Sequence, residues 1–256
     1  MSRPLLEARG VHRRFGHVQA LDGADFAVMP GEICALIGDN GAGKSTLVKI
    51  LSGADQLDEG QILLDGSPVS FGSPTASQRE GIATVYQDLA LAPELAAASN
   101  LYLGRELMRN GPLGRLGFVD RKTMRANSAT QFRNLGVVLK SPDVPVASLS
   151  GGQRQSIAIA RAAMWAKRVI FMDEPTAALG VIQTGRVLDL IRSVRDSGVA
   201  VVLVSHNMTQ VVEVADRVEV LRLGRRVARF ERGQATVDKL VTAMTSGAVN
   251  AEELNQ

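Results

Sequence analysis

The feature that most constrains the fold is a glycine-rich segment, Gly38 to Ser45, which reads GDNGAGKS. It follows a short apolar run that ends at Ile37, and a pattern typical of a helix begins near Lys44. Glycines allow consecutive backbone N–H groups to surround an anion, and the N-terminus of a helix adds its positive dipole at the same place. The segment therefore predicts a phosphate-binding loop between a buried strand and a helix. The alternative, a plain glycine-rich turn with a solvated lysine, does not explain this context.

Two side chains of the loop suit a phosphate ligand with its metal ion. Lys44 adds a full positive charge for the β- and γ-phosphates, and Ser45 offers a hydroxyl to Mg²⁺. We also expect Lys44 to take part in catalysis. The residues expected to bind the ligand are Gly38, Asn40, Gly41, Ala42, Gly43, Lys44, Ser45 and Thr46.

Two carboxylates, Asp173 and Glu174, come directly after the apolar run 169–172. In proteins with such a loop, a neighbouring strand delivers an aspartate to the Mg²⁺ shell, and Asp173 fits that role. Glu174 lies one residue further on, where a carboxylate can polarise the attacking water as general base. A solvated loop start is the alternative, and the phosphate loop earlier in the chain makes the catalytic interpretation the stronger one.

A second glycine turn, Ser150-Gly151-Gly152-Gln153, follows Leu149 and opens another predicted helix. It places a serine hydroxyl and glycine N–H groups at the positive end of that helix. Taken alone, the turn is equally consistent with an ordinary helix cap.

Short apolar strands alternate with helices along the chain, which predicts an α/β fold with a parallel sheet covered on both faces. Strands are expected at 18–28, 32–37, 62–64, 83–86, 169–172 and 199–204, and helices from 44 onward, at 151–166 and at 181–196. A mostly helical insertion is expected at about 93–165, with a helix at 121–135 capped by Gly136. The polar end of the chain, 247–256, is expected to be frayed.

Composition excludes several classes of protein. Lysine plus arginine is 29 and aspartate plus glutamate is 26, an excess too small and scattered to indicate a nucleic-acid partner. The single cysteine, Cys34, excludes an internal disulfide and fits a reducing compartment. No apolar run approaches the roughly 18 residues that span a bilayer, and residues 1–4 lack the profile of a secretory signal. We therefore expect a soluble, cytoplasmic protein.

Taken in order, the phosphate loop, the turn at Ser150 and the acidic pair resemble the ATP-binding subunit of ABC transporters over nearly the whole chain. The resemblance implies one ABC ATP-binding domain over residues 1–256, with ATP and Mg²⁺ as ligands and ATP hydrolysis as the reaction. The implied fold is an α/β P-loop NTPase core, RecA-like, with an N-terminal antiparallel β subdomain and an inserted α-helical subdomain at about 93–165.

Other residues match positions that function in this family. Phe15 falls where the family has an aromatic ring that stacks on adenine, and His206 falls at a histidine that contacts the γ-phosphate. Gln87 falls at a glutamine that joins the core to the helical subdomain and reaches Mg²⁺ and water. The resemblance also implies that each ATP lies between the phosphate loop of one copy and Ser150-Gly151-Gly152-Gln153 of another. The pair is either a homodimer or a dimer with a paralogous subunit.

One position departs from the family pattern. The family commonly has Ser-Ala-Leu-Asp after the acidic pair, whereas this chain has Ala177-Ala178-Leu179-Gly180. The absent carboxylate normally communicates across the dimer, so the resemblance implies altered coupling between the two ATP sites.

Within the family, the segments 38–43, 81–87, 100–106 and 177–180 resemble the ribose/fructose-type monosaccharide importers. This implies a membrane permease docked near Gln87, a periplasmic or extracellular solute-binding protein, and a peripheral location on the cytoplasmic face of the inner membrane. Import of a nucleoside or an autoinducer is an alternative. A soluble ABC ATPase that acts in DNA repair, chromosome structure or translation is another.

Overall fold

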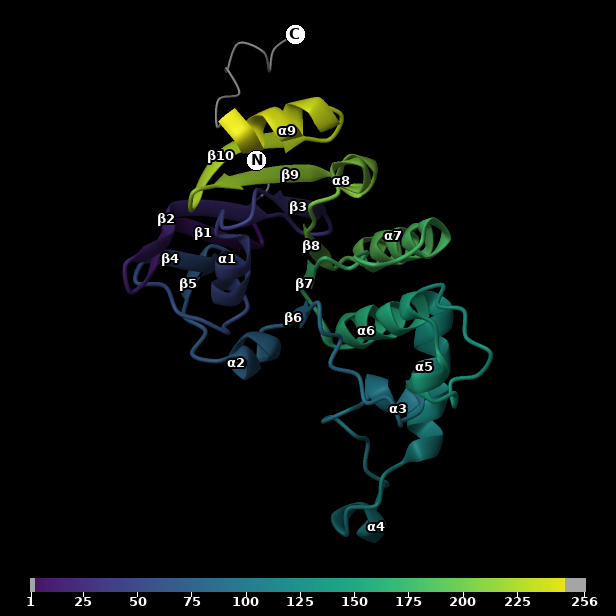
Figure 1. Ribbon diagram of the computed structural model, residues 1–256. Coiled ribbons are helices and arrows are strands. Elements are labelled where there is room, and N and C mark those ends of the chain that lie inside the picture. Colours follow the sequence, from purple (N-terminus) through teal and green to yellow (C-terminus); the bar gives the residue numbers. More distant parts are fainter. Residues whose placement is uncertain (1–2, 247–256) are drawn as a thin grey trace.

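The strands of the computed structural model, which describes residues 3–246, form two sheets (Figure 1). The predicted frayed segment, 247–256, lies outside the described residues. The strands are β1 (Leu6–Phe15), β2 (Val18–Val28), β3 (Ile33–Ile37), β4 (Glu59–Leu64), β5 (Ser67–Val69), β6 (Ile82–Val85), β7 (Val169–Asp173), β8 (Ala200–Val204), β9 (Arg217–Arg222) and β10 (Arg225–Glu231). The helices are α1 (Lys44–Leu51), α2 (Pro74–Arg79), α3 (Ala97–Leu101), α4 (Pro112–Arg115), α5 (Arg121–Asn134), α6 (Gly151–Trp165), α7 (Val181–Asp196), α8 (Met208–Val214) and α9 (Val237–Ser246), with a 3₁₀ turn at Val146–Ser148.

The N-terminal sheet has the strand order β2-β1-β4-β5, and each neighbouring pair is antiparallel. β1 and β2 form a hairpin that closes where Phe15 pairs with Val18. Gly16 supplies the left-handed backbone of the turn, with φ 57°. The antiparallel β subdomain that the resemblance implied is therefore confirmed.

The second sheet has the order β10-β9-β3-β8-β7-β6. The five strands β9, β3, β8, β7 and β6 pair in parallel. The predicted parallel sheet is confirmed for five strands, and at one edge it is extended by β10, which is antiparallel to β9. These two strands are joined by Leu223 and Gly224, whose φ values of 47° and 75° suit a tight hairpin turn. Arginines at both strand ends obscured the apolar alternation in the sequence.

Helices cover both faces of the parallel strands. Within β7, Val169 and Phe171 pack with α1 and the antiparallel sheet, whereas Ile170 and Met172 pack with α6 and α7. α8 and α9 cover the β3–β9 end of the sheet. Figure 1 shows α1 and α6 on opposite sides of β7 and β8. The buried side chains of β7 alternate between two apolar layers, so the strand reads as a continuous apolar run.

The predicted helical insertion combines helices with irregular backbone. Its long helices are α5 and α6, and Gly136, with φ 69°, follows α5 as predicted. Between α3 and α5 the chain is largely irregular, because Gly104, Gly111 and Gly117 all adopt left-handed φ values. The insertion shares one apolar core with the sheet, and Trp165 Nε1 ties α6 to α3 by donating to Leu101 O at 2.9 Å. Its boundaries at about 93–165 remain a prediction.

Among residues 3–246, no helix has the length and apolar character needed to cross a bilayer.

Candidate functional site

The predicted site residues gather at one edge of the six-stranded sheet. β3 leads into Gly38, β7 into Glu174, β8 into His206 and β6 into Gln87. Because these strands are parallel, their carboxyl ends meet at the same edge, with β8 between β3 and β7. This edge is where open α/β sheets bind ligands.

The phosphate loop is confined by its neighbours. Gly38 has φ 154°, and a Cβ there would overlap the carbonyl oxygen of Leu221. Gly43 has φ 99°, and a Cβ there would lie 2.6 Å from Ala20 O. β2 and β9 therefore press on the loop from two sides, and only glycine fits at either position.

Lys44 lies at the mouth of the loop. Its Nζ donates to Gly38 O at 2.7 Å and to Asp39 O at 2.9 Å. Burial lowers the pKa of Lys44, and the nearby carboxylates of Glu174, Asp39 and Asp173 oppose this shift. Lysine and the acidic pair are therefore electrostatically coupled in the fold.

The other loop residues differ in exposure. Ser45 is exposed and Thr46 half-buried in the first turn of α1, while Asn40 and Gly41 are exposed and Ala42 is buried. The hydroxyls of Ser45 and Thr46 and the backbone of the loop thus lie together at the N-terminus of α1.

Asp173 is the last residue of β7 and Glu174 follows it in a strained conformation. Burial raises the pKa of Asp173, while Lys44 and Lys49 oppose this shift. Glu174 has φ 50°, which is costly for a residue with a Cβ. Its backbone N–H donates to Val204 O at 3.0 Å, so β8 fixes its position.

Glu174 and His206 are in direct contact. Glu174 Oε1 lies 2.8 Å from His206 Nδ1. The glutamate side chain is 19% exposed and the histidine side chain 75% exposed. The carboxylate is therefore sheltered, and the imidazole lies on its solvent side. The structure thus brings Lys44, Asp173, Glu174 and His206 together.

Phe15 lies at the end of β1, in the hairpin whose second strand presses on the phosphate loop. Its ring is 47% exposed, and the Arg13 guanidinium lies 4.7 Å from the ring centroid. Arg13 is held in turn by Asp55 at 2.7 Å and Asp58 at 2.8 Å. This support was missed, since in the sequence Arg13 and Arg14 stand out only as a basic pair.

Gln87 is exposed, and within the described residues its side chain makes no hydrogen bond. The segment after it is attached to α6, because Arg161 donates to Ala90 O at 2.7 Å and to Leu89 O at 2.8 Å. Burial lowers the pKa of Arg161. The sequence analysis missed Arg161, although a cation directly after the apolar run 157–160 was a signal.

The turn at Ser150 does not join the other site residues. Gln153 N donates to Ser150 Oγ at 3.3 Å, and Ser150 N donates to Gln153 Oε1 at 3.1 Å, which is a capping box. α6 and α1 cover opposite faces of the sheet. Within residues 3–246 no hydrogen bond or ion pair links this turn to the phosphate loop of the same chain.

Gly180, the departure from the family pattern, is the N-cap of α7 and has no side chain to cap it. Instead, Gly180 N donates to Gln183 Oε1 at 3.0 Å. The side chain of Gln183 also packs on Gly152, where a Cβ would lie 3.0 Å from it. The segment after the acidic pair is therefore in contact with the turn at Ser150.

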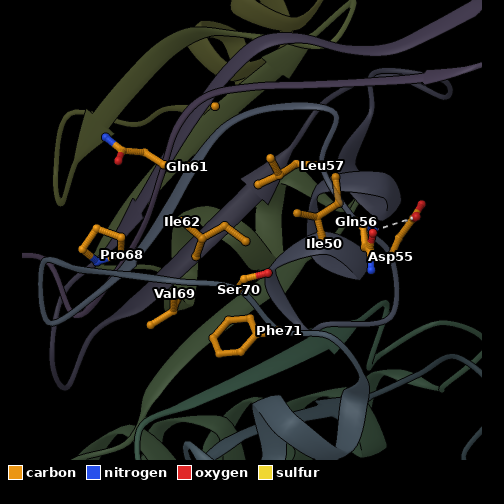
Figure 2. Close-up of a pocket in the computed structure, with 11 residues that line it drawn as sticks. Ile50, Asp55, Gln56, Leu57, Gln61, Ile62, Pro68, Val69, Ser70 and Phe71 are labelled. Atoms are coloured by element: carbon orange, nitrogen blue, oxygen red, sulfur yellow. Dashed lines mark hydrogen bonds between the residues drawn. The ribbon is translucent and has the colours of Figure 1, made fainter.

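A separate cavity of about 410 Å³ lies between α1, β4 and β5, and Figure 2 shows its lining. It contains none of the predicted site residues. The residues around it are Ile50, Asp55, Gln56, Leu57, Gly60, Gln61, Ile62, Pro68, Val69, Ser70 and Phe71.

Solved structures share this fold. A nucleotide-free ATP-binding cassette from an ABC transporter superposes with a TM-score of 0.77 at 24% identity, covering 98% of each chain. A second cassette of this kind gives a TM-score of 0.83 at 24% identity, covering 97% of this chain and all of its own. These likenesses establish the fold as that of an ATP-binding cassette.

Sequence comparison identifies the family. The family described as ABC transporter matches residues 21–177. The fructose import ATP-binding protein FrcA of Rhizobium meliloti is 49% identical and covers 94% of both chains. The xylose/arabinose import ATP-binding protein XylG of Sulfolobus acidocaldarius is 41% identical over 98% of both chains. A ribose import ATP-binding protein, RbsA 2 of Burkholderia pseudomallei, is 44% identical, and the match spans 46% of its length.

The chain therefore belongs to the ABC transporter family, as its sequence resemblance indicated, and it is a nucleotide-binding ATPase subunit.

The strained backbone of Glu174 generates a stability prediction. Glu174→Gly and Glu174→Gln both remove the carboxylate, but only glycine relieves the left-handed φ of 50°. We expect Glu174→Gly to exceed Glu174→Gln by about 1 kcal/mol in free energy of unfolding. Urea unfolding followed by fluorescence of the single tryptophan, Trp165, measures this difference.

Asp173, which lies in a strand with ordinary φ, supplies the matched control. There Asp173→Gly should be less stable than Asp173→Asn by roughly 0.5–1 kcal/mol. Equal or lower stability of Glu174→Gly relative to Glu174→Gln would show that the backbone at this position is not strained.

Proposed function

We propose that this chain is the ATP-hydrolysing subunit of a monosaccharide importer. The observation that carries the proposal is its 49% identity, over 94% of both chains, to a fructose import ATP-binding protein. Relatives named for import of xylose/arabinose and of ribose support the same solute class. In this proposal the chain lies on the cytoplasmic face of the inner membrane, beneath a permease that receives the sugar from a periplasmic or extracellular binding protein.

In the proposed reaction, Glu174 accepts a proton from the water that attacks the γ-phosphate. Its carboxylate is sheltered and oriented by the contact with His206 at 2.8 Å, which suits a general base. His206 and Lys44 donate to the γ-phosphate and stabilise the charge that develops on it. Phe15, backed by Arg13, stacks on adenine. The residues proposed to bind the nucleotide are those of the phosphate loop, Gly38, Asn40, Gly41, Ala42, Gly43, Lys44, Ser45 and Thr46.

The residues present also suit Mg²⁺. The hydroxyl of Ser45, the carboxylate of Asp173 and the amide oxygen of Gln87 are hard oxygen donors, as this ion prefers. Within the described residues, no cluster of three or more histidine, cysteine, aspartate or glutamate side chains forms a metal cage. Such a sparse set suits an ion that takes its other ligands from phosphate and water. When bound, Mg²⁺ neutralises the charge of the β- and γ-phosphates.

We further propose that ATP is bound between two copies of the cassette. Ser150-Gly151-Gly152-Gln153 presents an exposed hydroxyl and helix N-terminal N–H groups, yet it lies across the sheet from the phosphate loop of its own chain. The loop of one copy and the turn of another form a complete site in a head-to-tail pair. Closure of that pair excludes water and adds donors at the γ-phosphate.

The permease is proposed to dock on a cavity of about 280 Å³ between β6, α2 and α6. Tyr86, directly before Gln87, and Leu103 are exposed at this cavity, and Trp165 lines its wall. Arg161 attaches the segment after Gln87 to α6, and the Ser150 turn caps the start of that helix. A movement of the docked permease is therefore transmitted to both Gln87 and the Ser150 turn.

The solute class is tested in proteoliposomes that contain the chain, its permease and the solute-binding protein. Fructose, ribose or xylose should stimulate ATP hydrolysis severalfold, since the loaded binding protein favours the closed cassette pair. Stimulation by nucleosides but not by any monosaccharide would overturn the sugar assignment. Failure of the chain to co-purify with a permease would overturn the transport assignment.

Glu174→Gln tests the general base. Turnover should fall by about 10²–10⁴, or roughly 3–5 kcal/mol in the barrier, because glutamine cannot accept the proton. Binding of a fluorescent ATP analogue should remain near the wild-type level. Exposed Glu213 on α8, whose carboxylate pairs with Arg192 and not with a site residue, gives the matched control Glu213→Gln. Normal turnover in Glu174→Gln would remove Glu174 from this role.

Mixing two inactive variants tests the shared site. Lys44→Ala weakens nucleotide binding, and Ser150→Arg blocks the turn, so each variant alone should be inactive. A mixed dimer holds one intact composite site, and the mixture should regain part of the wild-type ATPase rate. Ser148→Arg, an exposed serine outside the turn, should stay active. If mixed dimers form but remain inactive, the loop of one copy and the turn of the other do not make a working site. Full wild-type activity per dimer would also contradict the two-copy site, because a mixed dimer holds only one intact site.

A further inference from the structure

The segment 107–122 projects from the helical insertion. In Figure 1 the α4 part of it lies at the end of the molecule farthest from α9 and the sheet strands β9 and β10. Within residues 3–246 it has few partners outside itself, and α4 has no buried residue. We call this segment the projection.

The projection is held in shape by its own backbone. Arg109 N donates to Phe118 O at 2.8 Å, and Phe118 N donates to Leu113 O at 3.1 Å. Asp120 N donates to Leu107 O at 2.7 Å and closes the base. The projection is therefore a preformed structure, and binding through it does not require the chain to order first.

Large apolar side chains lie exposed on the projection. Leu116 is 73% exposed and Phe118 is 53% exposed, and Met108 and Leu113 are also exposed. Four such side chains within so short a segment form a patch, unlike the single exposed apolar residues found on most surfaces. α4 has no buried residue, and the apolar side chains of the projection are left uncovered.

Positive charge surrounds these apolar side chains. The projection has four basic residues and one acidic residue, although the whole chain is nearly balanced at 29 basic and 26 acidic. Arg109, Arg115, Arg121 and Lys122 are exposed, and within the described residues none of them forms an ion pair. The acid, Asp120, is the N-cap of α5. Hydrogen bonds from Thr123 and the charge of Arg109 lower the pKa of Asp120.

We propose that the projection binds the surface of an anionic lipid bilayer. Exposed apolar tips among exposed cations are the combination that binds interfaces, because the tips enter the headgroup region while arginine and lysine attract anionic lipids. Charge complementarity favours a lipid surface, because the four exposed cations are long side chains that reach phosphate groups spread over a plane. The projection follows Leu103 and Arg105 in the chain, and these two residues line the cavity on which the permease is proposed to dock, so the projection begins near that cavity. This last point rests on the proposed function, whereas lipid binding itself does not.

Co-sedimentation of the full chain with vesicles tests the proposal. Vesicles of phosphatidylcholine with about 30% phosphatidylglycerol should bind the protein roughly tenfold more strongly than pure phosphatidylcholine, and about 0.5 M salt should weaken this binding. Leu116→Ser/Phe118→Ser should reduce binding about tenfold, and Arg109→Gln/Arg115→Gln should remove the preference for anionic lipid.

Matched controls come from other exposed residues. Leu223→Ser removes an apolar side chain that is 72% exposed, and Lys140→Gln/Lys167→Gln removes two exposed cations, all outside the projection. These variants should bind vesicles like the wild type, and all variants should bind ATP normally. The proposal is overturned if the wild type ignores anionic vesicles, or if the control variants lose binding as fully as the projection variants. It is also overturned if the projection crosslinks to the permease in detergent while vesicles bind nothing.

Discussion

The site depends on one constraint: two strands confine the phosphate loop, a short backbone segment suited to bind anions. Gly38 lies against Leu221 O and Gly43 lies against Ala20 O, so β9 and β2 fix the curvature of the phosphate loop. The loop is therefore shaped before any nucleotide arrives, which lowers the cost of binding a triphosphate. The other site residues are placed around this loop. Lys44 is held above it by two carbonyl oxygens, and β8 places Glu174 and His206 beside it.

The same sheet that organises the loop also separates the two halves of the proposed site. Alternate residues of β7 face α1 on one side and α6 on the other, so the loop and the turn at Ser150 are directed to different faces. A single chain thus presents two half-sites. Between them, Arg161 and Gln183 connect α6 to the segments that follow Gln87 and Glu174. At Gly180, where the family pattern has a carboxylate, the backbone N–H donates to Gln183 Oε1.

Much of the core could be predicted from sequence because its central strands β3, β7 and β8 are almost entirely apolar. β3, β7 and β8 were expected within a residue or two of their bounds, as were α6 and α7. The β9–β10 hairpin was missed because arginines occupy the ends of its strands. Its turn also places Leu223 at a left-handed φ, which a leucine in the sequence does not predict. The phosphate loop was predicted from the fixed spacing of its glycines and its lysine. The support from Arg13 was missed because the carboxylates that hold its guanidinium, Asp55 and Asp58, are distant in the chain. Arg161 stood out as a cation after an apolar run, but its partners, Leu89 and Ala90, are about 70 residues away. The roles of the individual site residues and the extent of the helical subdomain remain predictions.

The central claim, that nucleotide is bound between two chains, is tested most directly by a disulfide. The only native thiol, Cys34, is buried, so introduced cysteines report alone. Asn40→Cys and Ser150→Cys, both at exposed positions, are combined in the Glu174→Gln chain and oxidised with and without Mg-ATP. The account predicts a covalent dimer that forms with ATP and not without it. A disulfide within one chain, or no crosslink between chains when ATP is bound, would contradict it.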